Sequence, residues 1–117
     1  MKKTLGDLLL ERKIENEKYF RNFLKYAKIA KRIAEKELKD VRVFIFGSIV
    51  KKEHTPASDI DLLIISKNMP KRISERAKIQ AKILKKIGIF SPFEIHMVNE
   101  EEFKWYEKFI DKKIEVK

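Results

Sequence analysis

Residues 43–62 constrain this chain more than any other stretch, because they join two apolar segments through a short polar connection. The first segment, residues 41–46, is rich in β-branched and aromatic residues, which predicts a mostly buried strand. It ends on Gly47 and Ser48, and a second apolar strand is expected over residues 58–66. The stretch therefore predicts two buried strands joined by a polar loop.

Two carboxylates, Asp59 and Asp61, lie at the start of the second strand. Side chains alternate along a strand, so these two share one face while Ile60 and Leu62 take the other. Two acids at the mouth of an apolar strand repel each other and lose hydration, and a divalent cation between them makes the arrangement tolerable. Oxygen-only ligands favour Mg²⁺ or Mn²⁺ over Zn²⁺.

Gly47 and Ser48 supply a second chemical element. A glycine lets the backbone approach a ligand closely, and Ser48 can lead into a short helix whose first N–H groups are free to bind phosphate. A phosphate site facing a metal-binding acid pair is what phosphoryl or nucleotidyl transfer requires. Each part alone is a common turn or cap, so the specificity lies in the joint pattern of strand, Gly-Ser, ten residues, Asp-x-Asp and strand.

This joint pattern resembles the minimal nucleotidyltransferases of the DNA polymerase beta superfamily, over roughly residues 20–108. The resemblance implies a site for two metal ions. In it, Asp59 and Asp61 would bind Mg²⁺, or Mn²⁺ in its place, while Gly47 and Ser48 would hold a nucleoside triphosphate, with ATP expected.

The resemblance also implies a third carboxylate on a later strand, and Glu94 in the run Phe-Glu-Ile-His-Met-Val matches it. Glu94 would ligate the second metal ion or accept the proton of the acceptor hydroxyl. Lys51 and Ser58 are further candidate phosphate contacts, although Ser58 can equally cap the turn and Lys51 can equally be solvated. Members of the family often carry Arg-Gly where this chain has Lys51 and Lys52, and lysine cannot fork onto two oxygens as arginine does.

The periodicity of apolar residues predicts an α+β (mixed α/β) fold, a small mixed sheet with helices on one side. We expect a single domain over residues 1–117, with a long N-terminal helical segment at about 4–39 and a catalytic core at about 41–110. As one rod the helical segment would reach about 50 Å, so a break near residues 12–17 or a projecting N-terminal arm is expected. The remaining predicted elements are strands 41–46, 58–66 and 93–98, a helix over about 71–87, and a last helix after Asn99.

Each predicted helix carries an apolar face. In the first segment one stripe comprises Phe20, Leu24, Ala27, Ala34 and Leu38. A second stripe, Tyr26, Ile29 and Ile33, is either ordinary core or a surface for a dimer or partner. The next helix is expected to bury Ile73, Ala77, Leu84 and Ile87. The last is expected to begin with a capping box of Asn99 and Glu102, and to bury Phe103, Tyr106 and Phe109, with Trp105 also core rather than a base-stacking platform.

The composition sets limits on the function. A net charge of +10 is uneven: residues 71–90 hold seven basic side chains against one acidic. A basic helix face of this kind is either simply solvated or attracts an anionic partner, which would be nucleic acid or an acidic protein. The absence of cysteine excludes disulfides and thiolate metal sites and is compatible with a cytoplasmic protein. No run is long enough for a membrane span, and the Lys, Glu and Ile bias favours a thermophilic source.

These patterns predict a Mg²⁺-dependent nucleotidyltransferase that moves a nucleoside monophosphate, AMP expected, from a triphosphate to an acceptor hydroxyl. The alternative is a binding module that keeps the fold and neutralises a toxin or binds RNA without catalysis. The resemblance implies one protein partner, a helical HEPN ribonuclease toxin paired with this chain as antitoxin; a homodimer is the other expectation. His54 and His96 are isolated in the sequence and are assigned no zinc site.

Overall fold

Four helices surround a four-stranded mixed sheet in the computed structural model, which describes residues 2–117. In chain order the elements are α1 Leu5–Arg21, α2 Phe23–Leu38, β1 Arg42–Phe46, β2 Ile60–Ile65, α3 Ile73–Ile87, β3 Phe93–Val98, α4 Glu100–Glu107 and β4 Lys113–Glu115. The strand order is β3-β2-β1-β4. β2 and β3 run parallel, and β1 is antiparallel to both β2 and β4. The predicted α+β class with a mixed sheet is confirmed, but the helices do not all lie on one side, because α4 packs on the second face.

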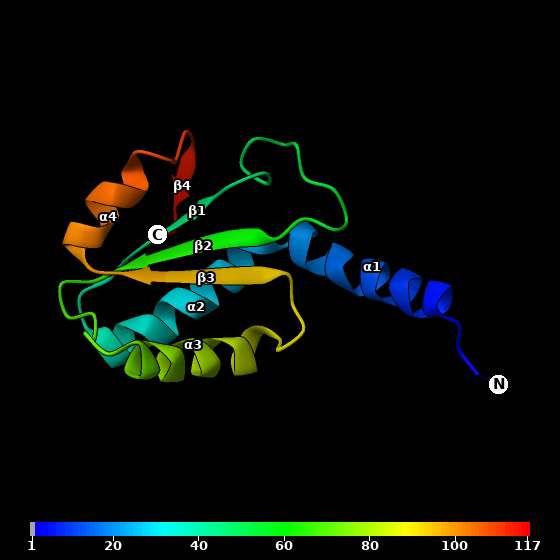
Figure 1. The fold of residues 1–117 in the computed structure, drawn as a ribbon, viewed down its shortest axis with the longest axis horizontal. Coiled ribbons are helices and arrows are strands. Elements are labelled where there is room, and N and C mark those ends of the chain that lie inside the picture. The colour runs from blue at the N-terminus through cyan, green and yellow to red at the C-terminus, as the bar shows by residue number, and fades with distance from the viewer. Residues whose placement is uncertain (1) are drawn as a thin grey trace.

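The main core lies between one face of the sheet and the two helices α2 and α3 (Figure 1). α3 is the crossover that joins the parallel strands β2 and β3, because parallel neighbours cannot be joined by a tight turn. Fully buried side chains of this core include Val43, Ile45, Ile60, Leu62, Ile64 and Ile83. Small residues of α2, Ala27, Ala30 and Ala34, are fully buried and let the helix lie close to the sheet.

The second face of the sheet is covered at one end only. There α4 packs Phe103 against Phe44, Leu63, Ile65 and Val98. α4 begins with the predicted capping box, in which Asn99 Oδ1 accepts from the Glu102 N–H at 2.8 Å and Glu102 Oε1 accepts from the Asn99 N–H at 2.9 Å. The other end of this face carries the polar side chains of Asp61, Glu94 and His96. Within residues 2–117, no helix covers the sheet there (Figure 1).

The N-terminal helical segment is broken at Asn22 and projects from the domain as α1 (Figure 1). The break lies beyond the residues 12–17 in which it was expected, because Asn22 ends α1 and starts α2, while a Thr4–Asp7 capping box holds the first turn of α1. Tyr19 is the buried residue of α1. Five large aliphatic side chains stay exposed along it: Leu5, Leu8, Leu9, Leu10 and Ile14. Among the helices of residues 2–117, none is both long and apolar enough to cross a membrane.

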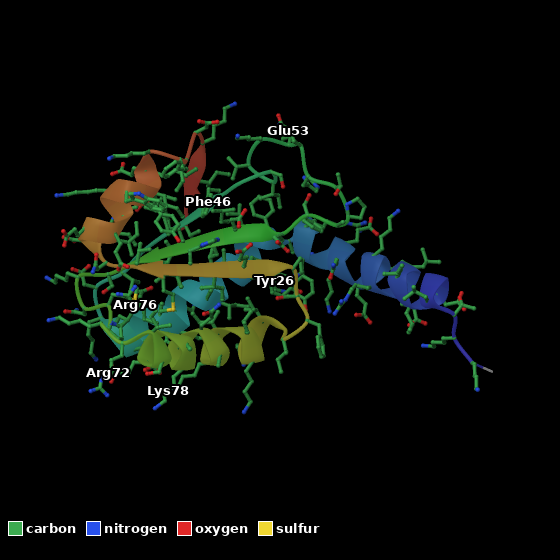
Figure 2. All side chains as sticks on the ribbon, in the orientation of Figure 1. Tyr26, Phe46, Glu53, Arg72, Arg76 and Lys78 are labelled. Carbon is green, nitrogen blue, oxygen red and sulfur yellow. The ribbon has the colours of Figure 1, made fainter. Side chains whose placement is uncertain are left out.

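Three helical core predictions were wrong in part. Ile73 is 80% exposed and Ala77 is exposed, because α3 buries Ile79, Ile83 and Ile87. Ile73 is the first residue of α3 and lies about 120° around the helix from Ile79. The outer side of α3 is basic, and Arg72 and Lys78 point away from the sheet (Figure 2).

The other two differences concern helix ends. Leu24 is exposed because it lies in the first turn of α2, off the alanine face that meets the sheet. Phe109 is exposed because α4 ends at Glu107, two residues earlier. Trp105, expected in the core, is exposed as well. In contrast, Tyr26, Ile29 and Ile33 are partly buried against the main core, which favours the core alternative for that stripe.

Candidate active site

The two halves of the Gly-Ser and Asp-x-Asp pattern meet where β1 ends and β2 begins. Antiparallel pairing sets Phe46 opposite Asp61, so the next residue, Gly47, lies beside the Asp61 side chain. Gly47 has φ +87°, a conformation that glycine adopts without strain. A β-carbon at this position would collide with the Asp61 carboxylate, whose Cγ would be 3.3 Å away. The site therefore requires glycine at position 47.

Ser48 opens a helix-like turn after β1. The Val50 N–H donates to the Gly47 carbonyl at 3.2 Å, and the Glu53 N–H donates to the Ser48 carbonyl at 2.9 Å. Ser48 is half-buried at the start of this turn. Lys51, further along the turn, is ion-paired with Asp111 at 3.0 Å. The turn thus presents its N-terminal end next to Asp61, as a phosphate-binding turn would.

A cluster of metal-binding side chain types is formed by Asp61, Glu94 and His96. The parallel register pairs Asp61 with Glu94, and His96 follows two residues later on the same face. Nε2 of His96 lies 3.2 Å from Asp61 Oδ1 and 3.8 Å from Glu94 Oε1. One ligand atom from each side chain lies within 4.8 Å of the other two. Asp61 and His96 are half-buried, while Glu94 is open to solvent.

Asp59 lies apart from this cluster. β2 begins at Ile60, so Asp59 belongs to the preceding loop and is exposed at the mouth of the strand. It lines a cavity of about 270 Å³ together with Arg12 and Asn16 of α1. The loop rather than the sheet therefore sets the orientation of Asp59.

Ser58 closes the loop that leads to the acid pair. The Thr55 N–H donates to Ser58 Oγ at 2.8 Å, and the two hydroxyl oxygens lie 3.3 Å apart. Of the two alternatives left open by the sequence, the turn-capping one matches this geometry. His54 stacks on Phe20 of α1 with ring centroids 5.1 Å apart and is not among the three clustered ligand residues.

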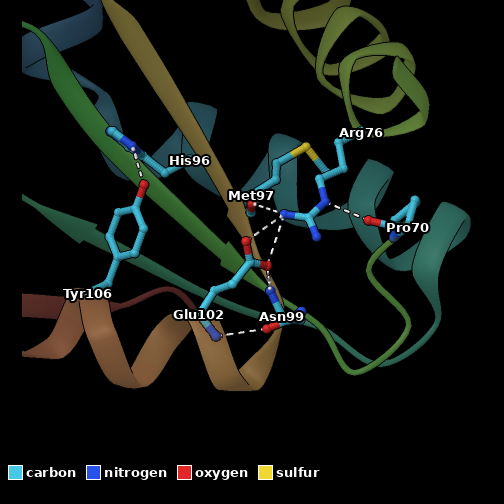
Figure 3. Close-up of polar contacts among 7 residues, drawn as sticks. All are labelled: Pro70, Arg76, His96, Met97, Asn99, Glu102 and Tyr106. Carbon is cyan, nitrogen blue, oxygen red and sulfur yellow. Dashed lines mark hydrogen bonds and ion pairs between the residues drawn. The ribbon is translucent and has the colours of Figure 1, made fainter. Parts of the chain in front are cut away.

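His96 is the site residue to which the sequence pattern assigned no role. Its strand position, two residues after Glu94, was the available signal, because residues i and i+2 share a face. The imidazole lies between two aromatic rings, Phe46 at 5.3 Å and Tyr106 at 5.8 Å between centroids. Tyr106 Oη lies 3.5 Å from Nδ1 (Figure 3), whereas the other ring nitrogen, Nε2, is the one that lies near Asp61. The ring is therefore held with Nε2 directed at the acids.

Arg76 fixes the helix that carries Tyr106. Its guanidinium donates to the carbonyls of Pro70 and Met97 and pairs with Glu102 at 3.0 Å (Figure 3). Glu102 is also the capping-box residue of α4, so this one cation ties the start of α4 to the end of β3 and to the loop before α3. The side chain of Arg76 is only 15% exposed, which makes these contacts strong ones.

The donor set of the cluster fits a divalent cation. Two carboxylates from adjacent strands would repel each other in the absence of a positive charge, and a neutral imidazole adds a nitrogen donor. Carboxylate oxygens alone suit Mg²⁺, and an added imidazole also suits transition metals such as Mn²⁺.

Comparison with known proteins bears on the family and the fold of the chain. The family model of the nucleotidyltransferase domain matches residues 26–116. The crystal structure of a candidate nucleotidyltransferase aligns with a TM-score of 0.63 at 32% identity, over 74% of this chain and 92% of that chain. That of another candidate nucleotidyltransferase, from Sulfolobus solfataricus, aligns with a TM-score of 0.57 at 19% identity, over 98% of this chain and 89% of that chain, and shows the fold alone. No curated protein matches the chain.

Proposed function

Because the chain belongs to the nucleotidyltransferase domain family, we propose that it transfers AMP from ATP to an acceptor hydroxyl in a Mg²⁺-dependent reaction. The observation that carries this proposal is the contact between the two halves of the site. The carboxylate of Asp61 lies against Gly47, and Glu94 is its partner in the neighbouring strand. The turn proposed to bind phosphate and the acids proposed to bind the metal ion are therefore adjacent.

In the proposed reaction the acceptor oxygen forms a bond to the α-phosphorus while the bond to the β-phosphate oxygen breaks, and pyrophosphate leaves. Asp61 and Glu94 would hold the divalent cation, and Asp59 would complete the ligand set from the loop. A cation bound there would neutralise charge that develops on the phosphate oxygens. The hydroxyl proton would pass to Glu94, the most exposed of the clustered carboxylates, or to the adjacent His96.

The phosphates would be held by the turn after β1. The hydroxyl of Ser48 would donate to a phosphate oxygen. The N–H groups at the start of the turn would add partial positive charge beside it. Lys51 would add a full charge after exchanging its exposed carboxylate partner Asp111 for phosphate, since a surface ion pair is weak.

The direct test is transfer of label from α-³²P-ATP. We expect Mg²⁺-dependent labelling of an acceptor in an extract of the source cell, or of the chain itself, that disappears in Asp61→Asn. A second readout needs no acceptor: ATP with Mg²⁺ should raise the unfolding temperature of the wild type and not of Asp61→Asn. An identical thermal response in the two proteins would rule out the proposed site.

A protein partner forms part of the same proposal. α1 projects from the domain with five exposed aliphatic side chains, and an isolated helix of this length is marginal in water. α1 also lies outside residues 26–116, which the family model matches. We infer that another chain covers α1, with the HEPN-type toxin of the family resemblance as first candidate and a second copy as the other.

A further inference from the structure

Two aromatic side chains lie exposed at the end of α4. Trp105 is 60% and Phe109 70% exposed, and their ring centroids are 4.8 Å apart. Aromatic rings of this size are normally among the most buried side chains, so a pair of neighbouring exposed rings indicates a binding surface. Packing in the core does not account for the two rings. The second core cluster includes Phe103, Tyr106 and Ile110 but neither Trp105 nor Phe109.

A continuous series of contacts links this pair to the candidate active site. Trp105 meets Tyr106 edge to face with centroids 5.6 Å apart, and Tyr106 meets His96 at 5.8 Å. His96 in turn lies 3.2 Å from Asp61. Figure 3 shows Tyr106 reaching from α4 to His96. Tyr106 and His96 therefore connect the exposed rings to the acids of the cluster.

A second tie joins the same segment to the phosphate-binding turn. Asp111, two residues after Phe109, is ion-paired with Lys51 of the turn after β1. The end of α4 is therefore attached both to the cluster of Asp61 and to the turn that starts at Gly47. The aromatic pair therefore lies on a segment that contacts both parts of the candidate site.

We propose that Trp105 and Phe109 form the stacking platform for the base of the nucleoside triphosphate, with purines preferred. The inference rests on the proposed function, since it places the base of the substrate whose phosphates lie at Gly47 and Asp61. Every nucleobase has flat π faces, so any of the bases can stack on tryptophan and phenylalanine. Purines expose the larger face, so they gain more from the contact.

The position of the pair favours a base over a protein as the occupant. The exposed aliphatic surface suited to a protein lies on α1, at the opposite end of the molecule from α4 (Figure 1). At the end of α4 the exposed apolar surface amounts to two rings, with exposed lysines and exposed acids both nearby. Two rings match the size of one base, whereas a protein interface needs a larger apolar surface.

Intrinsic fluorescence tests the platform directly, because Trp105 is the single tryptophan of the chain. The full chain with Mg²⁺ is titrated with α,β-methylene-ATP, with the corresponding CTP analogue and with tripolyphosphate, which lacks a base. We expect the ATP analogue to quench Trp105 and to bind more tightly than the CTP analogue. Tripolyphosphate should bind, as measured by calorimetry, without quenching.

Variants separate stacking from phosphate binding. Trp105→Ala removes the fluorophore, so its affinities are measured by calorimetry. Its affinity for the ATP analogue should fall about tenfold, the typical effect of removing one stacking contact, while its affinity for tripolyphosphate stays unchanged. Phe109→Ala should also lower the affinity for the ATP analogue. Because Phe109 lies beyond the end of α4, this change should not alter the helix. Phe90→Ala, an equally exposed phenylalanine in the turn before β3, is the matched control and should bind as the wild type does.

The outcomes distinguish this inference from the proposed function. If the ATP analogue and tripolyphosphate both bind and both aromatic variants keep wild-type affinity, the platform is wrong while the site for phosphates stands. If neither ligand binds the wild type, the proposed function fails, and the platform fails with it. Loss of analogue affinity in Phe90→Ala as large as that in Trp105→Ala would also overturn the assignment.

Discussion

The Asp61 carboxylate occupies the space where a β-carbon on Gly47 would lie. This contact explains both halves of the sequence pattern together. β1 and β2 pair so that Phe46 faces Asp61, and the chain must then turn away from the sheet at position 47 with φ +87°. Only glycine provides the left-handed conformation and the free space at once. The turn and the acid are thus positioned by each other.

Gly47→Ala should therefore damage both stability and the site. The strained backbone is expected to cost about 1–3 kcal/mol of unfolding free energy, and the new methyl group should displace Asp61. Urea unfolding measures the first effect, and the Mg²⁺-dependent thermal shift measures the second. Gly6→Ala in α1 is the control, because a β-carbon there meets only Thr4 Oγ1 at 3.7 Å and alanine favours a helix. Equal stability of the two variants would contradict the contact.

The two aspartates should differ in their response to Mg²⁺. A saturating cation should stabilise the wild type by about 2–3 kcal/mol at a hundredfold excess over its Kd. Asp61→Asn should abolish this gain, because Asp61 lies within the cluster. Asp59→Asn should retain part of it, since Asp59 stands outside in the loop. Differential scanning fluorimetry with a Mg²⁺ series gives the comparison, and a complete loss in Asp59→Asn alone would reverse the assignment.

The imidazole of His96 should influence which metal binds. Nitrogen donors favour transition metals more than they favour Mg²⁺. His96→Gln should thus weaken Mn²⁺ binding about tenfold or more while changing Mg²⁺ affinity less. Isothermal titration calorimetry with each ion measures both constants. The same fractional loss for the two ions would show that His96 only supports Asp61 and does not ligate.

The parts of the fold that were predictable are those set by local chemistry. Alternation along β3 put Glu94 on a polar face, and the structure pairs it with Asp61. The Asn99–Glu102 capping box was predictable because both partners lie within one helical turn. The fold class followed from the order of elements, since a helix between two buried strands favours a crossover.

The parts that were not predictable depend on contacts between distant segments. Whether His96 has a role depends on Asp61, 35 residues earlier. The exposure of Trp105 and Phe109 depends on how α4 packs on the sheet and where it ends. The helical spacing of apolar residues does not indicate either of these. β4 was not predicted at all, because its three residues form a strand only by pairing with β1.

Arg76 provides a test of how α4 is held. Arg76→Ala would leave the carbonyls of Pro70 and Met97 and the carboxylate of Glu102 without their common donor. A loss of about 2–3 kcal/mol in unfolding free energy is expected from broken hydrogen bonds to a charged group. Arg72→Ala, one turn earlier and exposed, is the control and should change stability by less than about 0.5 kcal/mol. Similar losses in both variants would show that removal of a positive charge from this end of α3, not the contacts of Arg76, is responsible.

The apolar surfaces of α1 and α2 should behave oppositely when charged. Ile29→Glu with Ile33→Glu should lower the unfolding free energy by about 3 kcal/mol or more, because both side chains pack against the main core. Leu8→Glu with Leu9→Glu should leave it within about 0.5 kcal/mol, because these side chains are exposed on α1. The α1 variant should instead lose association with its partner, which size-exclusion chromatography with light scattering detects for a second copy and co-purification detects for a toxin. If the α1 variant unfolds like the α2 variant, α1 is packed in the monomer and the partner surface lies elsewhere.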